Sequence, residues 1–573
     1  MKEWILREAP SQEVSDNLSN YSPFIRDLLF YRGILEDDEA RTFLNPDYET
    51  DFHDPFLILN MDKAVSRIMK AMEKDEKIVI FGDYDADGLP ASVLLADLFS
   101  EMGHSNFEVY IPHRYKEGYG LNKGAVKKFI QKKASILITI DCGITNHKEI
   151  ASAEKVGIDV IVLDHHIPHE KLPNAYAILN THQKDDKYPF KHLCGGGLSF
   201  KLAQAIAQKT KKNGLVNGWE KWLLDVAGIS TISDMVPLVG ENRAIAHFGL
   251  RVLQKTRRPG LLELMRVKHL SQKDITEEDI SFTITPHINA ASRMDTPAHA
   301  YKLLSTDDDA HAEEIVALLT EMNNDRKRRV EEIINRIEEI LHEHIPSGII
   351  SIGDSSWEPG VLGLAAQKIM ERYKMPVCLW GKEGSDVMRG SCRANGTVNI
   401  VELMGKMPKK HFIDYGGHAS SGGFSLTDNA LDGIQEAFRT AYGKVKNGHI
   451  PKEELFIEKK LSLDDVTWAN FKELIKLAPF GIGNPKPVFL FENILIDAIS
   501  FFGKTKDHLK LEFKKENGEK ISAVKFFTTP ESFKSVSLAN GSPLDVAATI
   551  EKNSYFRSPE LRLRIIDIKQ STL

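Results

Sequence analysis

The 573-residue sequence has few cysteines and no long hydrophobic run. Its four cysteines are scattered and form no CxxC pair, which argues against a zinc site of that kind. Isolated cysteines are typical of reduced thiols in the cytoplasm. No apolar segment is long enough to span a bilayer, and the N-terminus lacks the hydrophobic region of a signal peptide. We therefore expect a cytoplasmic protein that does not associate with a membrane.

The sequence also lacks an excess of basic charge, because its formal net charge is −7. There is thus no chain-wide signal for nucleic acid, although a local basic patch can still bind it. The hydrophobic content of 42% and the charged content of 27% are ordinary for globular proteins. The length predicts several domains, each with its own core.

One stretch, Lys77–Gly88 (KIVIFGDYDADG), combines a short apolar run with three acidic residues. The run Ile78–Phe81 predicts a buried strand, and Asp83, Asp85 and Asp87 follow it at alternate positions. Carboxylates this close repel one another unless a cation lies between them. Oxygen ligands favour Mg²⁺, Mn²⁺ or Ca²⁺. The stretch therefore predicts a metal-binding loop.

Two other interpretations of this stretch were weighed. Asp and Gly are common in turns, so an acidic surface turn is one alternative. A calcium-binding EF-hand loop also begins D-x-D-x-D-G, but it needs a helix before it and a Glu at its twelfth position. Here a strand pattern precedes the loop and Leu94 is the twelfth residue, so we set the EF-hand aside.

From about residue 51, predicted strands alternate with predicted helices. This alternation predicts a mostly parallel sheet covered on both faces, with ligands bound beyond the carboxyl ends of its strands. The predicted strands are Ile78–Phe81, Phe107–Ile111, Ile136–Ile140 and Val160–Leu163, and the predicted helices are Met61–Lys74, Ala91–Met102, Lys123–Lys132 and Lys148–Val156.

Polar side chains follow three of these strands. Besides the aspartates of the first strand, Asp141 follows the third, and Asp164, His165 and His166 follow the fourth. Because parallel strands end at the same edge of a sheet, we expect these groups to meet. Asp234 follows a predicted helix at Trp222–Val226 and a segment of small residues. Taken alone, it is more typical of a helix cap or a turn, but together with the other polar groups it is a candidate ligand.

The sequence outside these strands and helices predicts an N-terminal lead-in and three further structural regions. Residues 1–50 resemble a small helical lead-in, and residues 307–345 predict a long connecting helix, with a break near Asn323 as an alternative. The basic cluster Arg326–Arg329 lies on it, and a solvated helix face is slightly favoured over a DNA contact. Residues 346–448 predict a second α/β unit. Residues 449–573 predict five short strands, at Ile494–Ser500, Leu509–Phe513, Lys520–Lys525, Val546–Ile550 and Leu561–Ile568, which indicate a small barrel.

The motifs DYDADG, DCG, DHH and SDMVPL, in this order, resemble the four motifs of the DHH phosphoesterase superfamily. The longer pattern, from about residue 50 to about residue 570, is similar to the RecJ family of single-strand-specific 5′→3′ exonucleases. The resemblance implies an α/β protein with a DHH parallel-sheet domain (51–306), the long helix (307–345), a DHHA1 α/β domain (346–448) and an OB-fold domain (449–573).

The resemblance also implies roles for the residues at the strand ends. Two Mn²⁺ or Mg²⁺ ions are expected, with Asp141 bridging them. His166 is expected near the scissile phosphate, Asp164 is expected to orient a histidine, and Asp83 is either a ligand or a group that supports the ligands. The expected ligands are Asp85, Asp87, Asp141, His165 and Asp234.

Substrate contacts are implied by three other segments. Ser391 and Arg393 in GSCR and His418 in YGGH match elements that hold phosphate in DHHA1 domains, and their glycines let a ligand approach the backbone. The segment Thr285–Met294 resembles a motif written PRINAAGR, in which Asn289 and Arg293 match. His287 and Ser292 stand where that motif has Arg and Gly, so we assign no phosphate contact to His287. The segments Pro112–Asn122 and Cys194–Leu202 resemble cleft-lining segments.

The expected function is metal-dependent hydrolysis of single-stranded DNA from its 5′ end, releasing 5′ mononucleotides in DNA repair and recombination. The resemblance implies single-stranded DNA as substrate, and a single-strand-binding protein and a RecQ-type helicase as partners. One alternative is a DHH phosphodiesterase acting on nano-RNA, pAp or a cyclic dinucleotide, although such proteins usually lack the long helix and the barrel. Another is a non-catalytic replication scaffold, although such proteins usually lose metal ligands.

Overall fold

The computed structural model describes residues 2–210, 215–383, 387–427, 431–446, 454–503, 506–528, 536–553 and 559–571. The chain divides into two compact units. The first comprises Met1–His53, Met235–Phe248 and Lys452–Leu573, and the second comprises Asp54–Asp234 and Gly249–Pro451.

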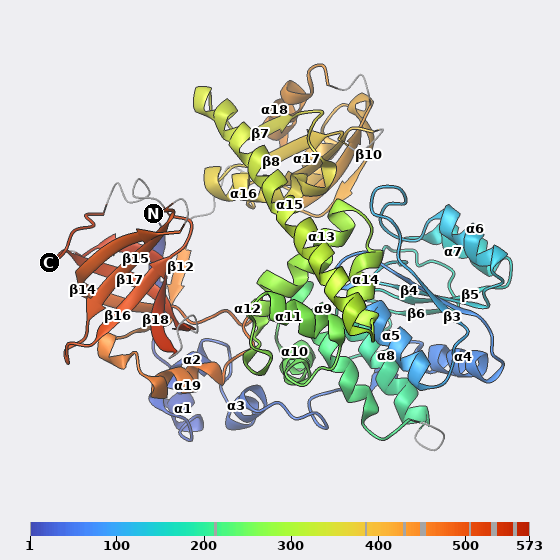
Figure 1. Ribbon diagram of the computed structural model, residues 1–573, viewed down its shortest axis with the longest axis horizontal. Coiled ribbons are helices and arrows are strands. Elements are labelled where there is room, and N and C mark those ends of the chain that lie inside the picture. The colour runs from blue at the N-terminus through green and yellow to red at the C-terminus, as the bar shows by residue number, and fades with distance from the viewer. Residues whose placement is uncertain are drawn as a thin grey trace. The chain divides into compact units, whose positions relative to one another are not determined.

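The second unit begins with a five-stranded, fully parallel sheet in the order β3-β2-β4-β5-β6. The four predicted strands are confirmed to within a residue, and β6 is an additional one. Figure 1 shows helices on both sides of the sheet, as predicted. The strands are β2 (Ile78–Gly82), β3 (Phe107–Tyr110), β4 (Ile136–Ile140), β5 (Asp159–Leu163) and β6 (Ala177–Leu179), and the flanking helices are α4 (Met61–Glu73), α5 (Gly88–Glu101), α6 (Lys123–Gln131), α7 (His147–Glu154) and α8 (Gly195–Thr210).

The sheet is held by a dry interior, since every residue of β2 and β4 is buried. Alternate residues of β2, Val79 and Phe81, share one core with Phe129 of α6 and Ile150 of α7. This pattern agrees with the near-continuous apolar strands expected when both faces of a parallel sheet are covered. The rigid sheet fixes the positions of the polar residues that follow its strands.

Helices continue the second unit after the sheet. Asp234 caps the C-terminus of α9 (Leu224–Ser233), so the segment of small residues before it is helical, which the sequence did not predict. The other helical elements of this unit are η2 (Trp219–Leu223), α11 (Pro259–Val267), η3 (Gln272–Asp274), α12 (Glu277–Asp279), the π-helix η4 (Ile280–Ile284), α13 (Thr285–Met294), α14 (Ala298–Ser305) and α15 (Asp309–Glu343), whereas most of α10 (Gly240–Leu253) belongs to the first unit.

Helix α15 runs unbroken for 35 residues, so the alternative of a break near Asn323 is wrong. Asn323 is buried there and faces α13. The C-terminal half of α15 packs on the next domain, where Ile333 and Ile337 share a core with Leu362 of α16 (Pro359–Tyr373). Figure 1 shows α15 running from the helices near α14 to the second sheet. Among the described helices, none is both long and apolar enough for a membrane span.

The second sheet is mixed, with the order β10-β11-β9-β8-β7. Only β7 and β8 are parallel, and the remaining neighbours are antiparallel. Its strands are β7 (Ile350–Gly353), β8 (Val377–Gly381), β9 (Arg389–Arg393), β10 (Phe412–Gly417) and β11 (Ser421–Leu426), with α17 (Ile400–Gly405), η5 (Lys409–His411) and α18 (Ile434–Val445) beside them.

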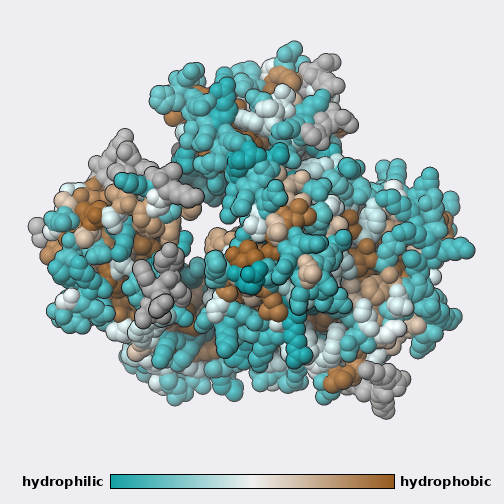
Figure 2. Space-filling view, viewed as in Figure 1, coloured by the Kyte–Doolittle hydropathy of each residue, from teal (hydrophilic) through white to brown (hydrophobic). Residues whose placement is uncertain are grey.

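The first unit contains a closed barrel built from the five strands predicted near the C-terminus. β14 pairs with both β15 and β17, and β16 pairs in parallel with β18, which closes the sheet. The strands are β14 (Phe489–Phe502), β15 (His508–Lys514), β16 (Lys520–Lys525), β17 (Pro543–Asn553) and β18 (Glu560–Gln570); β13 (Lys459–Lys460), η7 (Leu463–Asp465) and α19 (Trp468–Ile475) precede them. Figure 2 shows hydrophilic residues interspersed with hydrophobic ones on the visible face of the barrel.

The first fifty residues are not only helical, which corrects the predicted lead-in. β1 (Glu3–Leu6) pairs in parallel with β12 (Glu454–Ile457). The helices α1 (Gln12–Asn17), α2 (Pro23–Phe30) and α3 (Asp37–Leu44) follow, and η1 (Pro55–Leu57) begins the second unit. Leu28 and Leu29 of α2 share a hydrophobic core with Phe489 and Phe491 of β14. This segment and the barrel therefore stabilise each other.

Within the second unit, Arg258 connects three helices. Its Nη2 donates to Asp97 of α5 at 2.6 Å, its Nε to Asp225 of α9 at 2.7 Å, and its Nη1 to the carbonyl of Leu304 in α14 at 3.0 Å. Helix α5 begins directly after Asp87, and α9 ends at Asp234. The connection therefore fixes two helices that carry candidate ligands at their ends.

We predict that Arg258→Met lowers the free energy of unfolding by about 3 kcal/mol, because it leaves the buried carboxylate of Asp225 without its cation. Chemical denaturation measures this change. Arg266→Met is the control, since Arg266 is exposed and its one ion pair among the described residues is with Glu263 on its own helix. Equal effects of the two substitutions would contradict the role given to Arg258.

Candidate metal centre

The loop after β2 is shaped so that its carboxylates converge. A Cβ on Gly88 would lie 2.6 Å from the backbone nitrogen of Asp83, so only glycine allows this tight turn. Oδ1 of Asp85 accepts hydrogen bonds from the backbone of Asp87 at 2.8 Å and of Gly88 at 3.3 Å. The backbone of Ala86 donates to Oδ1 of Asn289 at 3.0 Å. The loop is thereby fixed from both sides.

Asp87 lies at the N-terminus of α8, deep in the protein. Its Oδ2 accepts from the backbone of Gly195 at 2.7 Å, and its Oδ1 accepts from the backbone of Gly196 at 2.8 Å and from the Ser230 hydroxyl. A Cβ on Gly195 would lie 2.8 Å from the Asp87 carboxylate, which explains why glycine is required there. These bonds hold the carboxylate in one orientation.

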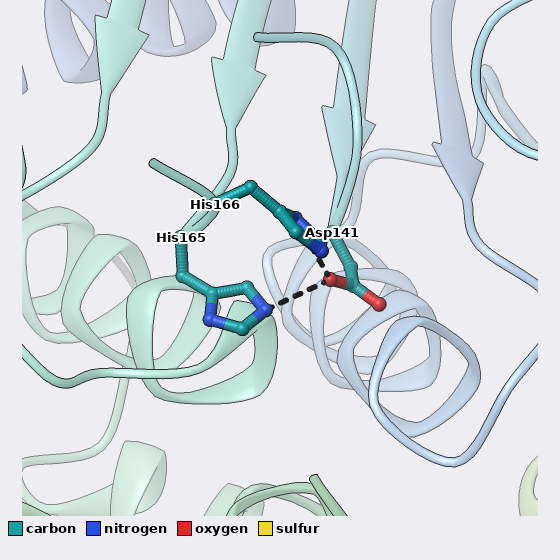
Figure 3. A group of neighbouring side chains, drawn as sticks. All are labelled: Asp141, His165 and His166. Atoms are coloured by element: carbon teal, nitrogen blue, oxygen red, sulfur yellow. Dashed lines mark ion pairs between the residues drawn. The ribbon is translucent and has the colours of Figure 1, made fainter. Parts of the chain in front are cut away.

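Asp141, directly after β4, lies between the other groups. It adopts a positive φ of 59°, and its carbonyl accepts from the Tyr119 hydroxyl at 2.9 Å. Its Oδ1 lies 3.2 Å from Nε2 of His165 and 3.8 Å from Nδ1 of His166. Figure 3 shows both imidazole rings, which follow β5, pointing at this one carboxylate oxygen. The predicted meeting of these two strand ends is confirmed.

The remaining predicted ligands lie around the same point. Nε2 of His165 is 3.6 Å from Oδ2 of Asp234 and 3.9 Å from Oδ2 of Asp87. The possible ligand atoms form three groups, each within 4.8 Å: Asp83, Asp85 and Asp141; Asp87, His165 and Asp234; and Asp141, His165 and His166. Asp141 thus stands beside Asp83 and Asp85 on one side and beside the histidines on the other.

Three carboxylate oxygens at this site are buried and have no hydrogen-bond partner among the described residues: Oδ1 of Asp83, Oδ1 of Asp141 and Oδ2 of Asp234. A buried, unpaired carboxylate oxygen is strongly unfavourable. Bound divalent cations would satisfy all three, and a site made mainly of carboxylates suits Mn²⁺ and Mg²⁺. The residues therefore fit two cations that share Asp141, with Asp83 close enough to be a ligand.

Burial and mutual repulsion disfavour the charged form of these acids when no cation is bound. Burial, and then the neighbouring carboxylates, raises the pKa of Asp83, Asp85 and Asp141, and raises that of Asp234 to about 9. Burial also lowers the pKa of His165, which keeps its ring neutral. A cation would reverse the effect on the acids, and a neutral imidazole is the form that binds metals.

His166 differs from His165 because Asp164 holds it. Nδ1 of His166 lies 2.7 Å from Oδ1 of Asp164, which also accepts from the His166 backbone, while Oδ2 accepts from Ile144 at 2.9 Å. Burial opposes ionisation of both side chains, but their hydrogen bond raises the pKa of His166 and lowers that of Asp164. His166 is therefore the more readily protonated of the two histidines.

The predicted phosphate contacts lie in the second sheet. Ser391 and Arg393 alternate on β9 with Cys392, which is buried in the core. Nη1 of Arg393 donates to the Ser391 hydroxyl at 3.1 Å. His418 is exposed in the connection from β10 to β11, whose first residue, Ser421, pairs with Arg393. The register thus places His418 near the end of the strand that carries Ser391 and Arg393.

The two residues predicted from the α13 motif lie in different places. Asn289 contacts the aspartate loop, as described above, so its role as a substrate contact stays a prediction. Arg293 donates to the carbonyl of Gly360 at the start of α16, at 3.0 Å. Burial, and then the charges of Arg114, Arg326 and Arg393, lowers the pKa of Arg293 to about 9. Arginine side chains from α13, α15 and β9 thus gather here.

Three residues at the site were not predicted individually. Arg114 lies over the Tyr84 ring at 4.8 Å, and the Tyr119 hydroxyl lies 3.3 Å from Nδ1 of His166. Both belong to Pro112–Asn122, a segment that the sequence singled out as a whole. Ser230, which donates to Asp87, lies in a segment of small residues with no distinguishing pattern.

Comparison with known proteins identifies three regions of the chain. Residues 77–228 match the DHH family, N-terminal domain; residues 345–444 match the DHHA1 domain; and residues 457–567 match the RecJ OB domain. These matches agree with the fold class inferred from the motifs.

Curated relatives cover most of the chain. It is 32% identical over 521 residues to the single-stranded-DNA-specific exonuclease RecJ of Bacillus subtilis, a match that covers 89% of this chain but only 64% of that protein. It is 27% identical to the protein of the same name from Haemophilus influenzae, over 98% of this chain and 97% of that one.

Solved structures share the fold. A crystal structure of RecJ with Mn²⁺ from Thermus thermophilus matches with a TM-score of 0.81 and 24% identity, over 100% of this chain and 80% of that one. A structure of exonuclease RecJ bound to manganese matches with a TM-score of 0.60 and 29% identity, over 68% of this chain and 95% of that one.

We predict that Mn²⁺ stabilises the protein, and that the effect grows as the pH rises. Without metal, the pKa of Asp234 is about 9 in the folded state and about 4 in the unfolded chain. Between these two pH values only the folded state keeps the proton on Asp234, so the free energy of unfolding falls as the pH rises through this window. A metal at 100 times its Kd adds about 2.7 kcal/mol per site.

Thermal unfolding with Mn²⁺ and with EDTA, from pH 6 to pH 8, measures both effects. Asp234→Asn removes one titrating group, so its Tm in EDTA should vary less with pH than that of the wild type. If the Tm is the same with Mn²⁺ and with EDTA at every pH, the residues do not form a metal centre.

Proposed function

We propose that the chain is a member of the RecJ family of the DHH phosphoesterase superfamily and acts as a single-stranded-DNA-specific exonuclease, as its three matched domains and its relatives support. It degrades DNA from the 5′ end and releases 5′ mononucleotides in DNA repair and recombination. The observation that carries the proposal is the set of three adjacent groups of possible ligand atoms, two of which contain Asp141, together with three buried carboxylate oxygens that have no hydrogen-bond partner among the described residues. The named relatives support the choice of substrate.

Two Mn²⁺ or Mg²⁺ ions would be held by the residues of these groups. Asp83, Asp85 and Asp141 would hold one ion, and Asp87, Asp141, His165 and Asp234 the other. When bound, such ions lower the pKa of a water and stabilise charge on the leaving oxygen. Manganese in a RecJ structure that is 29% identical supports this assignment.

The chain's own residues orient the reaction. Gly195, Gly196 and Ser230 fix the Asp87 carboxylate, and Tyr119 holds the backbone of Asp141. His166 carries a proton more readily than His165, and Asp164 orients it, so it donates a hydrogen bond or a proton to the scissile phosphate. Neutral His165 keeps its lone pair for metal binding.

The arginine group binds the 5′ phosphate of the strand. Arg114, Arg293 and Arg393 lie close enough that their charges act on one another, and Ser391 and His418 extend this group. Guanidinium groups grip phosphate through several donors at once. The acids and the arginines belong to the same unit, and the charge of Arg114 acts on both Arg293 and Asp83, which supports one strand contacting both groups.

The barrel of the first unit adds affinity for long single strands, as OB-folds do through basic grooves and aromatic stacking. The predicted partners, a single-strand-binding protein and a RecQ-type helicase, belong to this proposal as suppliers of single-stranded DNA. So does the cytoplasmic location, which four cysteines without disulfides support.

We predict that the protein releases 5′ mononucleotides from single-stranded DNA with Mn²⁺, and that EDTA abolishes the activity. Asp141→Ala should lower kcat by at least about 10³, because it removes the carboxylate shared by both ions. Asp62→Ala, at an exposed ion pair on α4, is the matched control and should retain full activity. Gel electrophoresis of labelled single-stranded DNA, duplex DNA and RNA measures the products released from each substrate.

Several outcomes would contradict the proposal. Equal digestion of duplex DNA would remove the single-strand specificity. Activity confined to nano-RNA, pAp or cyclic dinucleotides would favour a small-substrate phosphodiesterase. No hydrolysis with either metal would favour a non-catalytic scaffold, although every ligand position is filled.

We also predict that Arg393→Gln removes most of the preference for a 5′-phosphorylated strand over a 5′-hydroxyl strand, by about tenfold in kcat/KM, because it deletes a charged phosphate donor. Competition between the two oligonucleotides measures this preference. Arg439→Gln, in the same domain but paired with Glu436 at the surface, should leave it unchanged. An unchanged preference in Arg393→Gln would show that the arginine group does not hold the terminal phosphate.

A further inference from the structure

The basic cluster Arg326–Arg329 on α15 divides into two kinds of arginine. Arg328 pairs with Asp325 and Glu332, and Arg329 pairs with Asp325 and Glu358. These are the ion pairs of a solvated helix face. Arg326 instead donates from Nε at 3.2 Å and from Nη2 at 2.9 Å to the amide oxygen of Asn323. No carboxylate among the described residues forms an ion pair with it.

A chain of hydrogen bonds holds Arg326 in place from α13. Asn323 and His287 are buried, with exposed fractions of 2% and 3%. Nδ1 of His287 lies 2.6 Å from the carbonyl of Thr283, so this nitrogen carries the proton. Nε2 of His287 then accepts from Nδ2 of Asn323 at 3.4 Å, which turns the Asn323 oxygen toward Arg326. Each group in the chain has one possible orientation.

His287 carries no charge in this chain, since burial lowers its pKa to about 4. Arg326 of the neighbouring helix is joined to this neutral ring through Asn323, and its charge acts on the ring.

The charge of Arg326 adds to that of the arginine group at the candidate site. It acts on Arg293 together with Arg114 and Arg393. Burial also lowers the pKa of Arg326 itself. A partly buried guanidinium beside others of the same sign is unfavourable unless an anion joins them. If Arg326 had only a structural role, a neutral side chain could donate to Asn323 without this repulsion.

We propose that Arg326 is a further substrate-binding residue that contacts a phosphate of the bound strand, and that Asn323 and His287 are the positioning residues that hold it. This inference rests on the proposed function, because it requires a nucleic-acid strand at the site.

The test measures the binding of a 5′-phosphorylated single-stranded oligonucleotide to the full chain in EDTA. Fluorescence anisotropy gives the Kd at several salt concentrations. Arg326→Gln should weaken binding about tenfold and reduce the salt slope by about 0.7, the value for one lost phosphate contact on a single strand. Arg328→Gln is the matched control, because it removes the same charge two residues away and should leave the slope unchanged. Arg326→Lys should restore the slope but only part of the affinity.

Steady-state kinetics with Mn²⁺ separates binding from a structural effect. Arg326→Gln should raise KM with little change in kcat, and Asn323→Leu, which removes the hydrogen bonds to His287 and Arg326 but keeps the charge of Arg326, should raise KM to a smaller extent. If Arg326→Gln and Arg328→Gln behave alike while the wild type binds and cleaves DNA, this inference fails and the proposed function stands. If the wild type binds no single-stranded DNA, both fail.

Discussion

The constraint on which the structure depends is the burial of like charges at one edge of a parallel sheet. Asp83, Asp85, Asp87 and Asp141 are brought together where water does not screen them, and burial raises the pKa of three of the four. Much of the nearby architecture serves this arrangement. Gly88 permits the tight loop, Asn289 fixes it, and the start of α8 supplies backbone donors to Asp87. Such a site is stable only when positive charge enters it.

A second concentration of charge has the opposite sign. It consists of arginines from α13, α15 and β9 of the same unit, whose charges act on one another. Burial and these neighbouring charges lower the pKa of Arg293 to about 9. The charge of Arg114 acts on Asp83 and Asp85, but among the described residues no arginine of this group forms an ion pair with an acid of the site. A phosphodiester strand with divalent cations would balance both. This complementarity, more than any single residue, links the fold to hydrolysis of a nucleic acid.

The sheet and the acidic edge could be predicted from sequence because their signals are local. Apolar runs such as Ile136–Ile140 mark strands, and parallel topology brings their ends together without further information. Features that depend on distant packing could not be predicted. β1 pairs with a strand about 450 residues away in sequence, so no local pattern announces it. Ser230 and Tyr119 matter because of what they face, and α15 stays unbroken because Asn323 is satisfied by α13 and Arg326.

The central claim, that two cations share Asp141, is tested most directly by counting bound metal. Isothermal titration of the metal-free protein with Mn²⁺ should give two equivalents for the wild type, and Asp141→Asn should weaken both because it removes the carboxylate common to them. Arg328→Gln is the control, because Arg328 pairs with Asp325 and Glu332 and with none of the acids at the site. It should leave the stoichiometry at two. A single equivalent in the wild type, or two undiminished equivalents in Asp141→Asn, would contradict the account.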